Sequence, residues 1–361
     1  MRIVVVGASG NVGTAVLRAL RERPEVDEVV GIARRVPTRG SGAPYDAVHW
    51  HSIDISAAGA VAALADVFAR AAVVIHLAWQ IQPSHERLAI RDTNVDGSAR
   101  IAEAVVRADV PALVYASSVG AYAAGPKDRR VDESWPVTGV RSSTYSRDKA
   151  DVEAMLDQVE RDQPWLRVVR LRPGLTFQRD AASEIARLFI GPLVPTELLR
   201  LGRLPVVPRG RSLRVQAVHA DDVAQAYTLA ALSDARGPFN IVAEPVLDAT
   251  SVGSYFHGVG VPVPPAVLRV AADLTWRARL QPTEPGWVDL AVRCPLLDPT
   301  RAERELGWRP RIDAVSALAE LFDGMAQRRG TGSPALHARP GPVARVGAML
   351  TGRLPGHGNP Y

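Results

Sequence analysis

The stretch STYSRDKAD (residues 143–151) contains a tyrosine, Tyr145, four residues before a lysine, Lys149. On a helix this spacing places both side chains on one face, about one turn apart. A lysine is unusual in this chain, because 41 of the 43 basic residues are arginines and only Lys127 and Lys149 are lysines. An ammonium is more compact than a guanidinium and its pKa shifts more readily, so this choice favours a chemical role for Lys149. The alternative is an ordinary solvated helix.

A tyrosine and a lysine one turn apart can transfer protons. A free tyrosine titrates near about pH 10, so it acts as a general base at neutral pH only when its phenolate is stabilised. The positive charge of Lys149 stabilises that phenolate. The pair therefore predicts acid–base chemistry centred on Tyr145.

A glycine-rich segment predicts where a dinucleotide binds. GASGNVG (residues 7–13) follows an apolar strand at 2–6 and opens a helical pattern that continues to about Glu22. Glycines there permit a tight turn, close approach of a pyrophosphate and close helix packing, while the helix N-terminus attracts negative charge. The alternative is a tight strand-to-helix turn without a ligand.

The second strand indicates which dinucleotide is preferred. An acidic residue near its end would bind the ribose hydroxyls of NAD. This chain has GIARR at residues 31–35, with Ala33 at the strand end followed by Arg34 and Arg35. Two guanidinium groups suit the 2′-phosphate of NADP, so the sequence predicts NADP, with NAD as the alternative.

Alternating strand and helix patterns predict the fold. Strand-like runs occur at 2–6, 28–33, 73–77, 112–116 and 167–172, with helical stretches between most of them. This alternation is typical of a Rossmann-type, doubly wound parallel sheet in the α/β class. We expect a dinucleotide-binding domain at 1–174, to which about 211–245 returns, and a smaller substrate-binding lobe at 175–327. Residues 328–361 form a basic, Gly- and Pro-rich tail that we expect to be mobile or loosely packed.

Charge and composition exclude several functions. The net charge of +5 comes from residues 328–361, which contain five arginines and no Asp or Glu, while the rest of the chain has 38 basic and 38 acidic residues. Because the rest of the chain has no excess of basic residues, we expect no nucleic-acid partner. The apolar stretch 60–79 is interrupted by Asp66, Arg70 and His76, so we expect no stable membrane insertion.

Cysteine and histidine usage excludes further sites. The single Cys294 rules out an internal disulfide and a multi-cysteine zinc site, and the eight histidines show no metal-binding spacing. The first ten residues have too short an apolar run for a signal peptide. We therefore expect no metal and a cytoplasmic location.

A series of ordered motifs resembles the extended short-chain dehydrogenase/reductases, also called the NAD-dependent epimerase/dehydratase family. The resemblance covers roughly residues 2–325. It implies a nucleotide-binding domain, a smaller lobe that binds a small-molecule substrate, and a homodimer formed through helices of the cofactor domain. The motifs are GASGNVG (7–13), DI (54–55), HLAW (76–79), TNVDGS (93–98), VYASSVGAY (114–122), YSRDK (145–149), RLRPG (170–174), VHADDVA (218–224) and RAERELGWRP (301–310).

The resemblance also implies residue roles. Tyr145 transfers the proton, Lys149 assists it and Ser118 holds the substrate oxygen, while Asn94 supports the neighbouring helix and strand. In the reductive direction Tyr145 donates its proton as hydride reaches the carbonyl carbon. The cofactor-binding residues implied are Gly7, Ser9, Gly10, Asn11, Val12, Gly13, Arg34, Arg35, Asp54, Ile55, Leu77, Ala78, Trp79, Tyr145, Lys149 and Pro173.

The reaction is predicted from departures from the family pattern. Nucleotide-sugar members commonly place an Arg-Asp pair where this chain has Val215 and Gln216, and an asparagine where it has Leu175. These departures favour a carbonyl reductase or alcohol dehydrogenase acting on a less charged molecule. The alternatives are an epimerase or dehydratase that oxidises its substrate transiently and a non-catalytic cofactor-binding regulator, which the intact Tyr145 and Lys149 disfavour. His219 is expected to be structural, with Asp221 or Asp222 capping the next helix.

Overall fold

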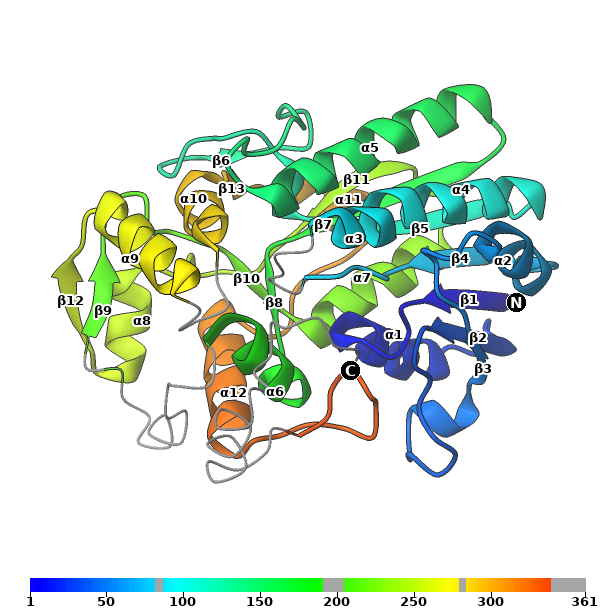
Figure 1. Ribbon diagram of the computed structural model, residues 1–361, viewed down its shortest axis with the longest axis horizontal. Helices are drawn as coiled ribbons and strands as arrows, with labels where there is room; N and C mark the ends of the chain where they lie inside the picture. The colour runs from blue at the N-terminus through cyan, green and yellow to red at the C-terminus, as the bar shows by residue number, and fades with distance from the viewer. Residues whose placement is uncertain (82–86, 191–203, 205, 279–283, 339–361) are drawn as a thin grey trace.

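A seven-stranded parallel sheet forms the centre of the protein (Figure 1). The structure, a computed structural model, describes residues 1–81, 87–190, 204, 206–278 and 284–338. The spatial order of the sheet is β11-β7-β5-β4-β1-β2-β3, so it winds outward in both directions from β1 and β4 and confirms the predicted doubly wound fold. The strands are β1 (Arg2–Val6), β2 (Glu28–Ala33), β3 (His49–Ser52), β4 (Val73–His76), β5 (Ala112–Ala116), β7 (Arg167–Pro173) and β11 (Gly237–Ile241).

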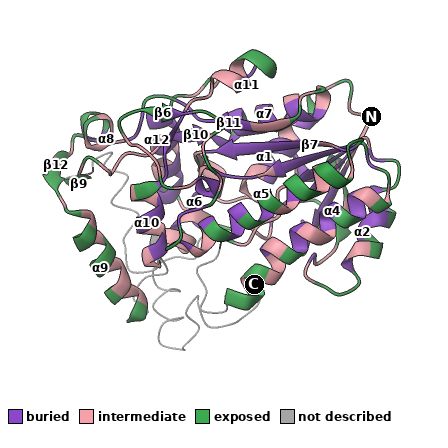
Figure 2. Ribbon diagram, turned by 90° about the horizontal axis from the view of Figure 1, so that it is seen from above, coloured by how far each residue is buried: buried purple, intermediate pink, exposed green. Residues whose placement is uncertain are grey.

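Helices cover both faces of the sheet. α1 (Asn11–Arg21) and α7 (Ala220–Leu232) pack together on one face, and α2 (Ala60–Phe68), α4 (Gly97–Arg107) and α5 (Thr144–Asp162) cover the other. Alternate residues of β1 enter the two cores: Ile3 and Val5 join the core under α1, whereas Val4 and Val6 join the core under α2. Burial on both faces explains why the central strands β1 and β4 are nearly continuously apolar (Figure 2).

Most of the remaining elements lie beyond the carboxyl edge of the sheet, at the left of Figure 1. Three pairs of short parallel strands occur among the described residues: β8 (Leu175–Phe177) with β10 (Ala217–His219), β9 (Val206–Arg209) with β12 (Val259–Pro262), and β6 (Arg130–Val131) with β13 (Leu296–Leu297). The helices are α6 (Ala182–Ile185), α8 (Ala249–Phe256), α9 (Pro265–Arg277), α10 (Pro285–Arg293), α11 (Thr300–Glu305) and α12 (Ala314–Ala326).

Short helical segments complete the described chain. They are α3 (Arg87–Arg91), η1 (Tyr45–Ala47), η2 (Asp92–Asp96), η3 (Val119–Ala121), η4 (Arg179–Ala181) and η5 (Ala186–Ile190). In the described ranges, no helix combines the length and apolarity that a membrane crossing requires.

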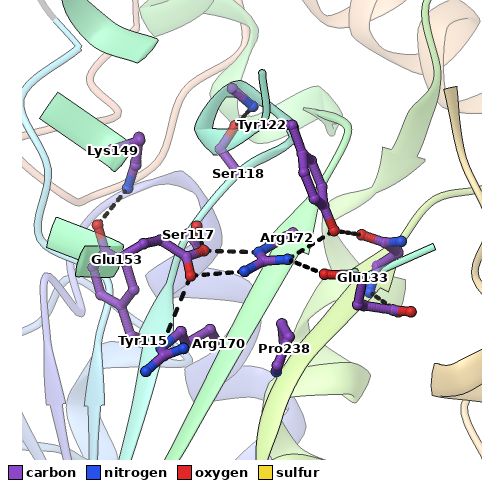
Figure 3. Close-up of polar contacts among 12 residues, drawn as sticks. Tyr115, Ser117, Ser118, Tyr122, Glu133, Lys149, Glu153, Arg170, Arg172 and Pro238 are labelled. Carbon is purple, nitrogen blue, oxygen red and sulfur yellow. Dashed lines mark hydrogen bonds and ion pairs between the residues drawn. The ribbon is translucent and has the colours of Figure 1, made fainter. Parts of the chain in front are cut away.

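A buried ion pair joins the sheet to α5 (Figure 3). Arg172 on β7 donates from Nε to Glu153 Oε1 and from Nη2 to Glu153 Oε2, both at 2.8 Å. The two residues are 3% and 2% exposed, so each charge needs the other as a partner. Burial alone would raise the pKa of Glu153, but Arg172, Arg170 and a hydrogen bond from Ser117 outweigh it and lower the pKa. The carboxylate therefore stays ionised.

The same arginine extends the network toward the edge strand β11. Arg172 Nη1 donates to Tyr122 Oη at 2.8 Å, and Tyr122 Oη donates to Asn240 Oδ1 at 2.7 Å. The backbone amide of Asn240 in turn donates to Glu133 Oε1 at 2.8 Å. One connected set of hydrogen bonds thus links β7, β11, α5 and the loops that follow β5 (Figure 3).

The beginning of the C-terminal tail is packed, although its composition predicts a mobile or loosely packed segment. Ser333 and Leu336 are both 0% exposed. The turn that contains them is closed by hydrogen bonds from Thr331 N to Leu336 O at 2.8 Å and from Leu336 N to Ser333 O at 3.1 Å. Residues 339–361 lie outside the described residues.

Replacement of Arg172 by methionine is expected to destabilise the protein strongly. Arg172→Met leaves the buried carboxylate of Glu153 without its bidentate partner, which costs about 3–5 kcal/mol in unfolding free energy. Urea denaturation measures this loss. The exposed Arg161 on α5 provides the control, since Arg161→Met is expected to change the unfolding free energy by less than about 0.5 kcal/mol. Equal stability of the two variants would contradict a structural role for the ion pair.

Candidate functional site

The carboxyl edge of the sheet brings the expected site residues together, as the order of parallel strands requires. Tyr145 and Lys149 reach this edge from the first turns of α5. The other residues follow the strands in order: Gly7, Ser9, Gly10, Asn11, Val12 and Gly13 after β1, Arg34 and Arg35 after β2, Asp54 and Ile55 after β3, Leu77, Ala78 and Trp79 after β4, Ser118 after β5, and Pro173 at the end of β7.

The glycine loop has the shape of a phosphate cradle. Gly7 has φ +87°, and a Cβ there would lie 2.5 Å from Ala78 N, while a Cβ on Gly13 would lie 2.3 Å from Gly7 O. Both positions are therefore closed to larger residues. A Cβ on Gly10 would meet only Gly7 O, at 3.5 Å, which leaves open space beside the start of α1.

The N-terminus of α1 retains donors for an anion. Gly10 is the N-cap residue and supplies no side-chain cap, so the helix dipole and the first amides remain open to a ligand. The side chain of Asn11 is already used, because Gln178 Nε2 donates to Asn11 Oδ1 at 2.6 Å and to Asn11 O at 2.8 Å. Asn11 can therefore bind a phosphate only through its backbone. The open cradle and the uncapped helix fit a dinucleotide pyrophosphate.

Arginine side chains gather near the end of β2. Arg35 is partly buried, and burial, followed by the nearby charges of Arg34 and Arg187, lowers its pKa. In the described part of the chain, neither Arg34 nor Arg35 forms an ion pair. Burial would raise the pKa of Asp54, but hydrogen bonds from Ser56 and the charges of nearby arginines lower it. The unpaired guanidinium groups suit an anionic ligand.

Tyr145 and Ser118 meet at the centre of the site. Tyr145 is partly buried, and desolvation raises its pKa to about 12, while a hydrogen bond with Ser118 acts in the opposite direction. Ser118 Oγ also accepts a hydrogen bond from Gly120 N at 3.0 Å. Ser146, next to Tyr145, donates to Gly120 O and thereby fastens the start of α5 to the Ser118 turn. In the protein without ligands, Tyr145 is therefore protonated at neutral pH and can donate.

Lys149 is buried close to the tyrosine but makes other contacts. Its Nζ donates to Ala116 O at 2.6 Å and to Tyr115 Oη at 3.3 Å, and lies 3.4 Å from the ring centroid of Trp79. The ring centroid of Tyr145 is 6.0 Å away. Burial lowers the pKa of Lys149 well below its usual range, while the negative charges of Glu153 and Asp148 oppose that shift. At this separation an ammonium on Lys149 would act on Tyr145 only through space.

Aromatic rings surround Tyr145. The ring of Trp287 lies 4.8 Å from that of Tyr145, and Trp79 lies 6.0 Å from it in an edge-on arrangement. Phe189 packs edge-on against Trp287 at 5.1 Å. Sequence patterns do not identify Trp287 and Phe189 as site residues, because both come from distant segments with no recognisable motif. In the described residues, the buried Nε1 of Trp79 lacks a hydrogen-bond partner and remains a donor for a ligand.

Glu153 places Ser118 relative to Tyr145. Ser117 Oγ donates to Glu153 Oε1 at 2.5 Å, so the end of β5 is tied to the helix that carries Tyr145 and Lys149. Because Glu153 also binds Arg172, three elements meet at one carboxylate. A glutamate four residues after Lys149 is the sequence signal that points to this positioning residue.

Gln216, which departs from the nucleotide-sugar pattern, and the nearby Arg214 form hydrogen bonds with the backbone of other segments. Gln216 Nε2 donates to Leu297 O at 3.1 Å, and Gln216 Oε1 accepts from Leu297 N at 2.6 Å. Arg214 Nη1 donates to Lys127 O at 2.5 Å. Lys127, the second lysine, donates from Nζ to Arg214 O at 2.7 Å and to Ala291 O at 2.8 Å. A compact ammonium among carbonyl groups explains the choice of lysine here.

His219 has a structural position, although its detail differs from the prediction. His219 itself caps α7, because its Nδ1 accepts from Asp221 N at 3.1 Å. Asp222 does not cap the helix and accepts instead from the amides of Arg311 and Ile312, each at 3.0 Å. In the described ranges, no group of three or more His, Cys, Asp or Glu side chains could hold a metal ion.

Comparisons with known proteins point to one family. The model of the NAD dependent epimerase/dehydratase family matches residues 3–242. An uncharacterised protein of Mycobacterium tuberculosis is 28% identical over 240 residues, which is 65% of this chain and 60% of that protein. The chain thus spans about 60% of the length of this relative. A UDP-glucose 4-epimerase of Neisseria gonorrhoeae is 28% identical over 259 residues, covering 66% of this chain and 70% of the epimerase.

Solved structures share the fold at low identity. UDP-glucose 4-epimerase of Thermotoga maritima, solved with UDP-glucose, has a TM-score of 0.66 and 20% identity over 91% of this chain and 99% of its own. dTDP-glucose 4,6-dehydratase of Streptomyces venezuelae, solved with NAD, has a TM-score of 0.64 and 20% identity. The match covers 91% of this chain and 97% of the dehydratase. These likenesses concern the architecture, a Rossmann-type sheet with a C-terminal lobe.

The sequence predicts acid–base chemistry at Tyr145, and loss of the Lys149 charge is expected to move the pH dependence of that predicted reaction in the direction of alcohol oxidation. Lys149→Met removes a positive charge near Tyr145, which raises the pKa of the phenol, so the rate of alcohol oxidation rises only at higher pH. At pH 7 the rate is expected to fall by about 10²-fold. The pH–rate profile measures both effects. Lys127→Met serves as the control and leaves the profile in place; an unmoved profile in Lys149→Met would contradict the role of this ammonium.

Proposed function

Because the chain belongs to the NAD-dependent epimerase/dehydratase family, we propose that it moves hydride reversibly between a nicotinamide and a secondary-alcohol carbon of its substrate. The family match over residues 3–242 confirms the resemblance seen in the motifs. The observation that carries the proposal is the meeting of Tyr145 with Ser118 near the buried Lys149, at the start of α5. We expect the other cofactor contacts to come from the glycine loop and the neighbouring strand ends.

The chemistry of the site follows from its charges. When bound, the nicotinamide accepts hydride from the alcohol carbon or returns it to the carbonyl carbon. During oxidation the phenolate of Tyr145 takes the hydroxyl proton, and during reduction the phenol gives it back to the carbonyl oxygen. Ser118 donates a hydrogen bond to that oxygen, and Lys149 stabilises the phenolate. Burial keeps water away from the reacting atoms.

We favour transient oxidation within one turnover, as in an epimerase. The sequence departures favour net carbonyl reduction, but the family and the characterised relatives support epimerase or dehydratase chemistry better. Dehydration needs an acid for the departing hydroxyl group. The side-chain partners of Tyr145 described above are Ser118, Lys149 and the rings of Trp79 and Trp287, and none of these is a carboxylic acid. Epimerisation requires only the alcohol–ketone chemistry that these residues can perform.

The aromatic surroundings favour a substrate with apolar C–H faces. Trp287 and Trp79 offer flat apolar walls at Tyr145, which suit a sugar ring or another cyclic alcohol. Arg214 and Gln216 already bind backbone groups of the fold. We therefore propose that recognition depends on the ring and requires no diphosphate.

The amount of nicotinamide oxidised or reduced, compared with the amount of product formed, tests the proposed reaction. The protein is incubated with cyclic alcohols, ketones, free sugars and nucleotide sugars while absorbance and product mass are followed. Transient oxidation predicts an isomeric product without net consumption of cofactor, whereas one reduced nicotinamide consumed per product would establish net reduction instead. Tyr145→Phe is expected to lower turnover by about 10²–10⁴-fold while nucleotide binding persists. Full activity of this variant would contradict the mechanism.

We propose NADP as the preferred cofactor, on the basis of Arg34 and Arg35 after β2, which form no ion pair with any other described residue. NAD is the alternative, and it is the nucleotide named with several solved structures of similar fold. Arg35→Ser is expected to weaken NADPH binding by about tenfold or more, because one charge-assisted contact to the 2′-phosphate is lost, and to leave NADH binding unchanged. Calorimetric titration measures both dissociation constants. Tighter binding of NADH than of NADPH by the unmodified protein would overturn the preference.

A further inference from the structure

The chain does not leave the fold at the end of α12 but crosses back to the cofactor domain. We name residues 328–338 the C-terminal strap. Arg328 has φ +55°, and Arg329 N donates to Gly324 O at 2.8 Å, so the chain reverses directly after the helix. Figure 1 shows the strap, in orange and red, running from α12 toward α1.

The strap is bonded to the glycine loop. Ser333 Oγ donates to Ser9 O at 2.5 Å, and both residues are buried. Ser9 lies between Gly7 and Gly10, so this bond fixes the backbone that forms the phosphate cradle. Leu336, three residues after Ser333 in the strap, is 0% exposed.

The strap also fastens the segment that follows β2. Thr331 Oγ1 lies 2.8 Å from Tyr45 Oη, which lies 3.1 Å from Thr14 Oγ1 on α1. Ser41 Oγ donates to Gly332 O at 3.3 Å. A Cβ on Gly332 would lie 2.9 Å from Ser41 O, so the two backbones approach closely. The strap therefore joins α1 to the loop beyond Arg34 and Arg35.

A third contact concerns an arginine from outside the cofactor domain. Arg187 Nη2 on η5 donates to Ala335 O at 3.2 Å. The charge of Arg187, together with that of Arg34, lowers the pKa of Arg35, so Arg187 adds positive charge near the end of β2. Glu184, the acidic neighbour of Arg187, has its pKa raised to about 7 by burial and compensates this positive charge incompletely near neutral pH.

We propose that the C-terminal strap is part of the cofactor site: it braces the glycine loop and holds Arg187 beside Arg34 and Arg35, and so slows release of the dinucleotide. The inference rests on the proposed function only for the binding of a nicotinamide dinucleotide. Retention suits transient oxidation, because the reduced cofactor must stay bound until it returns the hydride to the substrate.

Release kinetics test the strap in the full-length protein. The variant Thr331→Val/Ser333→Ala removes both side-chain bonds with little change in volume. It is expected to release NADH and NADPH about tenfold faster than the unmodified chain, measured by stopped-flow fluorescence after displacement. This corresponds to about 1.4 kcal/mol. Ser316→Ala, on α12 but outside the strap, is the matched control and keeps the original rates.

Arg187→Met distinguishes the two proposed effects of the strap, the bracing of the glycine loop and the positioning of Arg187. In the proposed cofactor site Arg187 lies near the 2′-phosphate of bound NADP, so this variant is expected to release NADPH several-fold faster and NADH at the original rate. Release rates of the double variant within twofold of the unmodified chain, with binding intact, would overturn the strap proposal alone. A full-length protein that binds neither nucleotide would overturn the strap and the proposed function together. Thermal unfolding of each variant establishes that the chain is folded during the measurement.

Discussion

The bidentate ion pair between Arg172 and Glu153 joins β7 to α5 beneath the carboxyl edge of the sheet. Both charges are sealed from water, so α5 cannot shift along the sheet without separating them. Tyr145 stands on the same helix about two turns before Glu153, and Lys149 about one turn before it. Ser117 binds the same carboxylate, which fixes the strand end that carries Ser118. The relative positions of the three proposed catalytic side chains therefore depend on one buried contact.

Burial sets the charge state of this centre as well as its geometry. Desolvation raises the pKa of Tyr145, which favours the neutral phenol, and it lowers the pKa of Lys149, a shift that the negative charges of Glu153 and Asp148 oppose. An oxidised nicotinamide would bring positive charge into the same enclosure and favour the phenolate. The C-terminal strap belongs to the same account, because a site that changes charge with its cofactor works through many turnovers only when that cofactor is retained.

Local motifs were sufficient to predict the sheet, the glycine loop and the group formed by Ser118, Tyr145 and Lys149. The glycine loop and the pair of Tyr145 and Lys149 depend on spacings within one turn or one helix, the sheet on the alternation of strands and helices, and Ser118 on the resemblance to the family. Trp287, Phe189 and the strap could not be predicted, because they reach the site only after segments far apart in the sequence have packed together. The strap also shows why composition misleads: its Gly- and Pro-rich sequence predicts loose packing, yet one buried leucine and a few hydrogen bonds hold it in place.

The titration of Tyr145 tests the central claim most directly, because it requires no substrate. The phenolate absorbance of the unmodified protein minus that of Tyr145→Phe, followed against pH, reports this tyrosine alone. The account predicts a pKa of about 12 without ligand and a clearly lower pKa when an oxidised nicotinamide dinucleotide is bound. A pKa near the ordinary value of about 10 that does not change on binding would contradict it.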